Sequence, residues 1–262
     1  AQTECKTCPS GYVCSGATIH PDPCPEGHYC PGSTEYATQF PCPNGTFSNL
    51  TMLAAMSDCL ECLPGKYCGS PALVAPTGFC AAGYFCTGGA MVESPFSGSP
   101  SGYTGDTCVD QSNATANDIC PEGHYCPKGT GSPLRCPAGT MGPSKGYENI
   151  SQCADCTAGY YCPKEATVTA TQLCIEGYYC PGGDATPTFK CPAGHYCPEG
   201  STEASPCSAG TYQNVTAQTE CKTCPSGYVC SGATIHPDPC PEGHYCPGST
   251  EYATQFPCPN GT

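Results

Sequence analysis

Residues 24–46 read CPEGHYCPGSTEYATQFPCPNGT, and two patterns in this stretch limit what the chain can fold into. The first, C-x-x-G-x-[YFV]-C, occupies Cys24–Cys30, and the second, C-x-x-G-T, begins at Cys42 and lacks the closing cysteine. Glycine tolerates the positive φ of a tight turn, proline after cysteine disfavours a helix, and the aromatic residue can pack on a disulfide. The stretch therefore predicts short strands and turns held together by disulfides.

Both patterns recur along the chain. The closed pattern begins at Cys8, Cys24, Cys62, Cys80, Cys120, Cys156, Cys174, Cys191, Cys224 and Cys240. Within residues 1–216 the open pattern begins at Cys42, Cys136 and Cys207, and each time a N-x-[ST] sequon and then, 14 to 17 residues after the open cysteine, a CxxC pair follow. A longer period is also present, because residues 1–46 and 217–262 are identical at an offset of 216. Such repeats predict tandem modules that contact mainly their neighbours.

The composition favours disulfide bridges over an apolar core. The chain has 29 Cys among 262 residues and no Trp, and Leu, Ile, Val and Phe together make up only about a tenth of it, too little for one large core. A cytosol would keep so many thiols reduced, so we expect an extracellular, secreted or cell-surface protein. The net charge of −14 argues against nucleic acid and anionic membranes as partners. No apolar run of about 18 residues predicts a membrane span.

A zinc site is the alternative use of the CxxC pairs that begin at Cys5, Cys59, Cys153 and Cys221. These pairs lie much farther apart than the roughly 12 to 20 residues of zinc fingers, and the histidines show no HxxxH spacing. No nucleophile elbow, HExxH or phosphate loop is present, and most of the six His lie inside the cysteine pattern, where an exposed turn residue suffices. We therefore predict no metal site, no catalytic residue and no cofactor.

The asparagines indicate glycosylation. Six of the seven Asn lie in N-x-[ST] sequons, and only Asn117 does not. The candidate acceptors are Asn44, Asn49, Asn113, Asn149, Asn214 and Asn260. Because chance would place only one or two of seven Asn in sequons, this enrichment predicts surface loops that carry covalent N-glycans.

The cysteines divide the chain into blocks that each open on a CxxC. We expect cysteine-rich blocks at 1–58, 59–152 and 153–216, with 217–262 starting the next 216-residue repeat. Block 59–152 contains a Gly/Ser/Pro-rich insert at 87–119, typical of a protruding loop that can carry O-glycans. Within that insert lies Cys108, which belongs to no pattern and forms either an interchain bridge or an unrecognised intrachain one.

One short stretch has a helical pattern. Leu50–Asp58 (LTMLAAMSD) places apolar residues loosely on one side. It is too short to be a stable helix alone, so it adds little to the predicted fold.

The succession CPxGxYCP, CPxGT, sequon and CxxC resembles the ephrin-receptor-like cysteine-rich repeats, which are similar to the modules of tumour necrosis factor receptors and to growth-factor-like modules. The density of the GxYCP form also resembles long surface proteins of protists and algae, such as mastigonemes. This resemblance implies an elongated rod of small, mostly irregular, disulfide-rich modules. It also implies forward pairing of the open cysteines, as Cys42–Cys59, Cys136–Cys153 and Cys207–Cys221. Under this pairing, Cys5 and Cys258 would find their partners outside residues 1–262.

The closed patterns leave two pairings open. Each can close on itself, or neighbouring patterns can interleave, as Cys8 with Cys24 and Cys14 with Cys30. In either case, the perfect long period favours a structural role. We expect a repeat of a long, N-glycosylated, disulfide-cross-linked extracellular filament or surface fibril, such as a flagellar hair, surface coat or wall component, whose partner is the same chain end to end and laterally. The alternative is the stalk or ligand-binding ectodomain of a cysteine-rich receptor or adhesin.

Overall fold

The computed structural model describes residues 6–16, 19–95 and 117–259. Cys5, Cys108, Asn113 and Asn260 lie outside these ranges. The chain forms two compact units. Unit 1 comprises Ala1–Leu134 and Ser144–Gln152, and unit 2 comprises Arg135–Pro143 and Cys153–Thr262.

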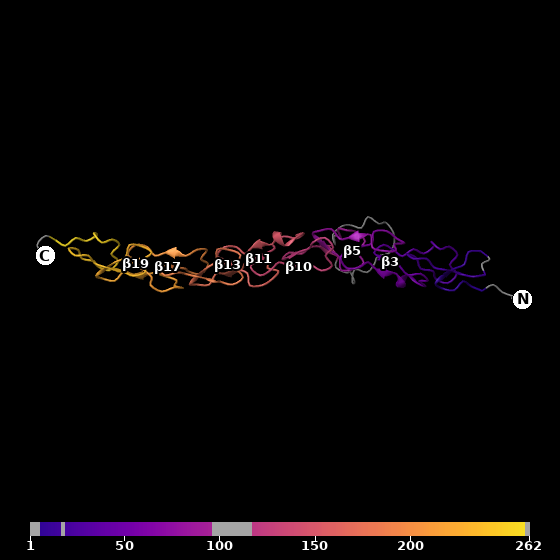
Figure 1. Cartoon of the computed structure of the whole chain (residues 1–262), viewed down its shortest axis with the longest axis horizontal. Coiled ribbons are helices and arrows are strands. Elements are labelled where there is room, and N and C mark those ends of the chain that lie inside the picture. The colour runs from indigo at the N-terminus through magenta and orange to yellow at the C-terminus, as the bar shows by residue number, and fades with distance from the viewer. Residues whose placement is uncertain (1–5, 17–18, 96–116, 260–262) are drawn as a thin grey trace. The chain divides into compact units, whose positions relative to one another are not determined.

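Both units are built from one small element. Each occurrence of the closed or open pattern forms a module, whose positions we number from 1 at its first cysteine to 7. In most modules, positions 5 and 6 form a two-residue strand that pairs antiparallel with the two residues before the next module, as when Tyr160 faces Leu173 and Tyr161 faces Gln172. The modules that begin at Cys24 and Cys240 have a single bridge in this place, between His28 and Pro41 and between His244 and Pro257. Every ladder within either unit joins strands that are consecutive in the chain. The modules of unit 2 therefore follow one another in chain order, from β11 through β13 and β17 to β19 (Figure 1).

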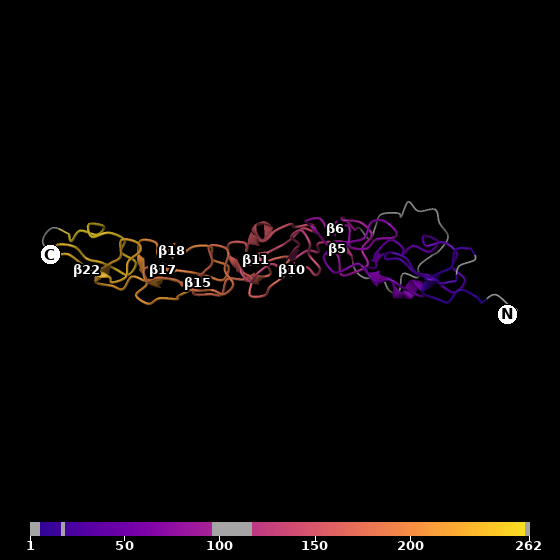
Figure 2. The ribbon, with the colours of Figure 1, turned by 45° about the vertical axis from the view of Figure 1, so that its right-hand side comes forward.

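The strands of unit 1 and its two 3-10 turns are short. They are β1 (Tyr12–Val13), β2 (Asp22–Pro23), β3 (Thr46–Phe47), η1 (Met56–Asp58), β4 (Leu60–Glu61), β5 (Lys66–Tyr67), β6 (Gly78–Phe79), β7 (Tyr84–Phe85), β8 (Asp118–Ile119), β9 (His124–Tyr125) and η3 (Ile150–Gln152). The ladders β1–β2, β3–β4, β5–β6 and β7–β8 are antiparallel. Figure 2 shows β5 beside β6 in this unit.

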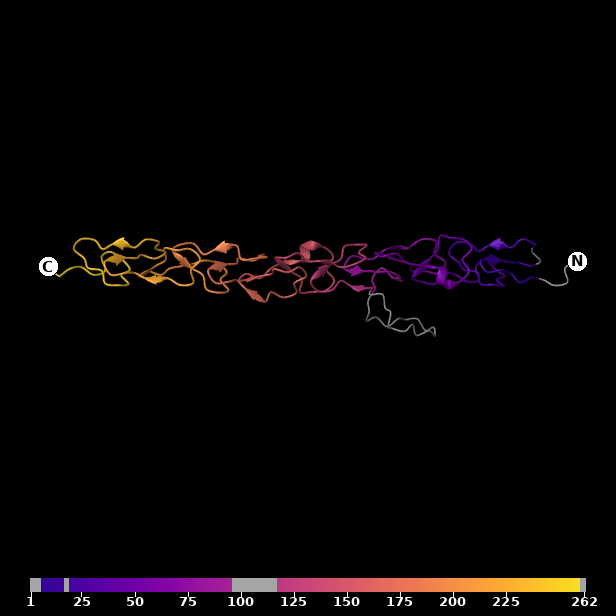
Figure 3. The same ribbon diagram turned by 90° about the horizontal axis from the view of Figure 1, so that it is seen from below.

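Unit 2 repeats the same plan. Its strands are β11 (Thr140–Met141), β12 (Ala154–Asp155), β13 (Tyr160–Tyr161), β14 (Gln172–Leu173), β15 (Tyr178–Tyr179), β16 (Phe189–Lys190), β17 (His195–Tyr196), β18 (Ser205–Pro206), β19 (Thr211–Tyr212), β20 (Lys222–Thr223), β21 (Tyr228–Val229) and β22 (Asp238–Pro239). β10 (Leu134–Arg135) contains the boundary between the units. All six ladders of unit 2 are antiparallel. Seen from below, the strands still succeed one another in chain order within the unit (Figure 3).

Burial is concentrated on the disulfides. Most of the buried hydrophobic residues in the described ranges are cysteines, and few aliphatic or aromatic side chains join them. The clusters are small: Val13 packs with Cys24 and Cys30, and Phe47 packs with Cys62 and Cys68. The predicted fold class is thus confirmed, as tandem disulfide-rich modules of short strands and turns without a large apolar core.

Within each unit, a backbone hydrogen-bond relay joins neighbouring modules. In unit 2, the amide of Gly159 donates to the carbonyl of Cys180 (N···O 2.9 Å), and the amide of Cys174 donates to the carbonyl of Gly159 (2.8 Å). The glycine at position 4 therefore holds both ends of the following module's disulfide. Because backbone groups removed from water must be paired, this relay satisfies donors and acceptors that the two-residue strands leave over.

Contacts also reach the module after next. A Cβ atom on Gly159, whose φ is +81°, would lie only 2.7 Å from the carbonyl oxygen of Gly200. Gly200 lies three residues after position 7 of its module and itself has a positive φ. All seven non-glycine residues with positive φ in the described ranges lie three or four residues after position 7: Ser33, Met52, Ala72, Ala166, Ala217, Ala233 and Ser249. Each module thus has two left-handed points, one at position 4 and one after position 7.

The stretch Leu50–Asp58, whose pattern is loosely helical, forms no α-helix. Only Met56–Asp58 forms a 3-10 turn, η1. Met52 has a φ of +65°, which a right-handed helix excludes, and Leu53 is buried against Cys42 and Cys59. The apolar side chains therefore serve the disulfide cluster rather than a helix face.

Candidate functional site

The closed modules bridge their own two cysteines. Ten disulfides join positions 1 and 7 at a sequence separation of six, so the structure contains local closure and not the interleaved alternative. In the bridges Cys24–Cys30 and Cys174–Cys180, both cysteines are buried. These bridges form the scaffold, and they leave the open modules as the sites where the pattern differs.

The open modules bridge forward onto the following CxxC. Cys42 bonds Cys59, Cys136 bonds Cys153, and Cys207 bonds Cys221, at separations of 17, 17 and 14 residues. These are the three pairs that the resemblance to ephrin-receptor-like repeats implies. We call them clamp bridges, because each encloses a loop between an open module and the next closed one. The Cys42–Cys59 and Cys136–Cys153 bridges also cross the block boundaries expected at 58/59 and 152/153.

Position 7 of an open module is buried although it carries no cysteine. Ser48 and Gln213 are 0% and 1% exposed, and the third residue, Gly142, is buried as well. The Ser48 Oγ accepts a hydrogen bond from the amide of Leu50 (3.2 Å), and the Gln213 Oε1 accepts one from the amide of Val215 (3.2 Å). Two different side chains thus make the same contact, with the residue two positions later.

Asparagine follows directly at position 8 in the same two modules. Asn49 and Asn214 are exposed. We call the buried side chain at position 7, with its hydrogen bond to the amide two residues later, a brace. The amide that each brace holds belongs to the middle residue of the sequon. In the third open module, glycine offers no side chain, and the sequon begins seven residues later, at the exposed Asn149. There the Oδ1 of Asn149 accepts from the amide of Ser151 (3.0 Å) and from its hydroxyl.

Asn44 has a different environment, at position 3 of the Cys42 module. It is half-buried, and its Oδ1 is buried without a hydrogen-bond partner. The hydroxyl of Thr46, the third residue of this sequon, donates to the carbonyl of Pro43 (2.7 Å). The sequence pattern alone did not separate this site from Asn49.

One described cysteine carries a free thiol. Cys258 is half-buried and unbonded, whereas Cys42, which occupies the same place in the identical first copy, is bonded to Cys59. Pairing of Cys258 and Cys5 outside residues 1–262 stays a prediction.

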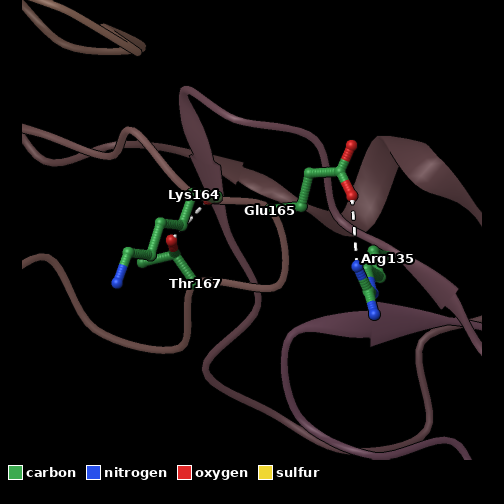
Figure 4. A network of polar contacts seen from close by, with 4 residues as sticks. All are labelled: Arg135, Lys164, Glu165 and Thr167. Atoms are coloured by element: carbon green, nitrogen blue, oxygen red, sulfur yellow. Dashed lines mark hydrogen bonds and ion pairs between the residues drawn. The ribbon is translucent and has the colours of Figure 1, made fainter.

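Two other polar contacts of the described residues lie near one another in unit 2. Arg135 and Glu165 form an exposed ion pair at 3.7 Å, and the Thr167 hydroxyl donates to the carbonyl of Lys164 at 2.7 Å (Figure 4). A depression of about 140 Å³ lies beside Lys164, between Tyr161 and Gln172, smaller than the about 300 Å³ at which small-molecule pockets begin. Within the described ranges, no three His, Cys, Asp or Glu residues are arranged to hold a metal ion, and no helix is long and apolar enough to cross a membrane.

The histidines of the pattern share one structural contact. Their Nδ1 atoms lie 2.9 to 3.3 Å from the carbonyl oxygen two residues earlier, in His28, His124, His195 and His244. A carbonyl can only accept, so Nδ1 carries the hydrogen. The ring thereby ties down the turn at position 3, in keeping with a turn residue.

Neither models of known protein families nor curated proteins match the chain. The likeness to ephrin-receptor-like repeats therefore stays a prediction, and the proposal for function depends on the geometry of the modules.

The sequence reasoning missed the residues that organise the loops. Ser48 and Gln213 are residues of different types, so no sequence pattern identifies them. Their shared place at position 7 of an open module is the signal that could have found them. Asn117, the one asparagine outside a sequon, holds the base of the insert. Its Oδ1 accepts from the amide of Thr87 (2.7 Å), and its Nδ2 donates to the carbonyl of Gly88 (2.8 Å).

Proposed function

We propose that the chain is a structural repeat of a long, N-glycosylated, disulfide-cross-linked extracellular filament or surface fibril, in which it associates with further copies of itself. A flagellar hair, a surface coat or a wall component would have this construction. The chain has no catalytic role in this proposal.

The relay between modules carries the proposal. Gly159 contacts the module that follows and the module after that, and the same contacts recur from Gly11 to Gly83 in unit 1 and from Gly139 to Gly210 in unit 2. A module is therefore completed by those that follow it, and adding modules adds the same interface again. Stability in such an array is a sum of repeat and neighbour terms, so length is set by copy number rather than by the size of a core.

The covalent chemistry supports an extracellular place. Thirteen disulfides occur among the described residues, and cytosolic thiols would be kept reduced. With so little apolar core, reduction would remove the main constraint on the chain. A structure of this kind gains resistance to proteolysis and drying from its bridges rather than from burial.

Electron microscopy of the native material tests the proposal. We expect negative-stain images to show filaments labelled by an antibody against residues 117–259. The same filaments should lose their regular appearance after reduction and alkylation. Antibody label confined to separate particles, together with a transmembrane segment and cytoplasmic domain in the native polypeptide, would overturn the filament and favour a receptor ectodomain.

A further inference from the structure

We propose that Ser48 and Gln213, at position 7 of two open modules, are positioning residues for glycans on Asn49 and Asn214. The buried position-7 side chain fixes the sequon so that the asparagine at position 8 faces solvent. This inference rests on the proposed function in one respect, because the chain must pass through a compartment that attaches N-glycans.

The first brace is compact. The Ser48 Oγ accepts from the amide of Leu50 (3.2 Å) and lies 3.3 Å from its carbonyl oxygen, to which the hydroxyl can donate. The backbone of Ser48 is itself held on both sides, by the amide of Gly27 (2.9 Å) and the carbonyl of Leu73 (2.9 Å). The residues before and after Asn49 are thus fixed while Asn49 itself is exposed.

The second brace is longer and reaches across its loop. The Gln213 Oε1 accepts from the amide of Val215 (3.2 Å), and its Nε2 donates to the carbonyl of Glu220 (2.8 Å), next to the clamp cysteine Cys221. The amide of Gln213 also donates to the carbonyl of Thr234 in the next module (2.9 Å). One buried side chain therefore joins the sequon to the clamp bridge.

The asparagine contacts leave the acceptor nitrogen available. Lys222 Nζ donates to the Oδ1 of Asn214 (2.9 Å), and at Asn149 both bonds from Ser151 also end on Oδ1. A glycan is attached through Nδ2, and the amide oxygen remains an acceptor afterwards. These contacts can therefore persist when the sugar is present and hold its first linkage in one orientation.

The Asn44 sequon lacks this arrangement. Its side chain is half-buried, with Oδ1 enclosed and unpartnered, and it lies in the turn at Gly45, where a Cβ atom would be 2.6 Å from the carbonyl oxygen of Gly89. A sugar on Asn44 would have to fit where the module after next approaches. Folded chains are therefore expected to carry glycans on Asn49, Asn149 and Asn214 and none on Asn44.

The modification itself uses a lipid-linked oligosaccharide pyrophosphate as donor. A bond forms between Nδ2 and C1 of the first sugar, the C1–O bond to the pyrophosphate breaks, the lipid pyrophosphate leaves, and the amide nitrogen loses one proton. The protein contributes the acceptor and its surroundings and is neither oxidised nor reduced.

Native deglycosylation measures the braces. The full chain is secreted from glycosylating cells and treated, folded and unreduced, with a peptide-N-glycosidase in H₂¹⁸O, so that each released site becomes a labelled Asp that mass spectrometry can assign. Loss of one buried hydrogen bond shifts local opening by about fivefold. We expect Ser48→Ala to speed release at Asn49 by about fivefold and leave Asn214 unchanged, and Gln213→Ala to do the reverse.

Each variant thus contains its own control, because the braced site that it leaves intact should release at the wild-type rate. If Ser48→Ala is not secreted, Gln213→Glu serves instead, because it keeps the acceptor for Val215 and loses the donor to Glu220. Unchanged rates at the braced sites, or a glycan on Asn44 in folded protein, would refute the inference. Filaments imaged on the same samples separate the outcomes: filaments with unchanged rates refute the inference alone, and site-specific acceleration without filaments refutes the proposed function alone.

Discussion

Two glycines with a left-handed backbone but different surroundings allow the relay to be tested. Gly27 lies at position 4 of its module and has a φ of +74°, and Gly89 lies three residues after position 7 of its module and has a φ of +62°. A Cβ atom on Gly27 would lie 2.4 Å from the carbonyl oxygen of Ala72, in the module after next, whereas one on Gly89 would meet nothing within 4 Å. Alanine at either position therefore carries a similar backbone strain, and only Gly27→Ala adds a collision.

The expected magnitudes follow from these two terms. A left-handed backbone costs alanine about 1–2 kcal/mol relative to glycine, and this term is common to both variants. Forcing a methyl group against backbone adds about 1–3 kcal/mol, since a carbonyl cannot rotate away as a side chain can. Gly27→Ala should therefore destabilise its module by about 1–3 kcal/mol more than Gly89→Ala, which is about 5- to 150-fold in local opening.

Amide hydrogen exchange provides a local reading in a molecule with many disulfides. The amide of Cys42 donates to the carbonyl of Gly27 at 2.9 Å, and the amide of Cys68 donates to the carbonyl of Ala90, beside Gly89, at 2.8 Å. Exchange at Cys42 should accelerate in Gly27→Ala far more than exchange at Cys68 in Gly89→Ala, each relative to its own wild-type rate. Equal acceleration in the two variants would show that glycine serves only the local turn, and the relay to the module after next would be wrong.

Three further substitutions test the clamp and the surface. Cys59→Ser should leave Cys42 as a thiol that can be alkylated. It should also lower the free energy of unfolding of the loop by about 3 kcal/mol, as expected for a closed loop near 15 residues, and hydrogen exchange can measure this. Continued protection of Cys42 from alkylation would count against the clamp bridge. Ser48→Cys combined with Cys59→Ser should convert the open module into a closed one, and peptide mapping without reduction should find a bridge between position 7 and Cys42; a free Cys42 would contradict this. Arg135→Ala should change the thermal midpoint by less than about 1 °C, because its partner Glu165 is 60% exposed and such pairs contribute little; a shift of several degrees would give this ion pair a structural role.

The sequence was most informative about what happens inside a module. The cysteines at positions 1 and 7 and the glycine between them predict a tight, bridged turn, and this is what forms at Cys174–Cys180 with Gly177 at +79°. The bridged turn depends only on residues within one module, so the local sequence is enough to predict it. The clamp pairs could be inferred only through a resemblance, because 17 residues separate Cys42 from Cys59.

The contacts between modules could not be read from the sequence. The atom that faces Gly27 is the carbonyl oxygen of Ala72, which any residue type would supply. The braces are similarly hidden, since Ser48 and Gln213 reach the same kind of amide with side chains of different length. The helical pattern at Leu50–Asp58 was misleading for a related reason, because Asp58 Oδ2 accepts from the amides of Ala54 and Ala55 (2.9 Å each) and so fixes only the last turn.

The hydrogen bonds of Asn117 close the base of the insert at 87–119. Asn117 brings Thr87 and Gly88 to the start of β8, so the chain leaves and re-enters the ladder β7–β8 at one point, although the residues joined are 30 positions apart. The strands of this ladder, 84–85 and 118–119, pair beside the base of the insert. This junction is therefore a site for inserting a foreign domain. A domain fused between residues 96 and 116 would be displayed once per 216-residue period, so the number of repeats would set the number of copies displayed.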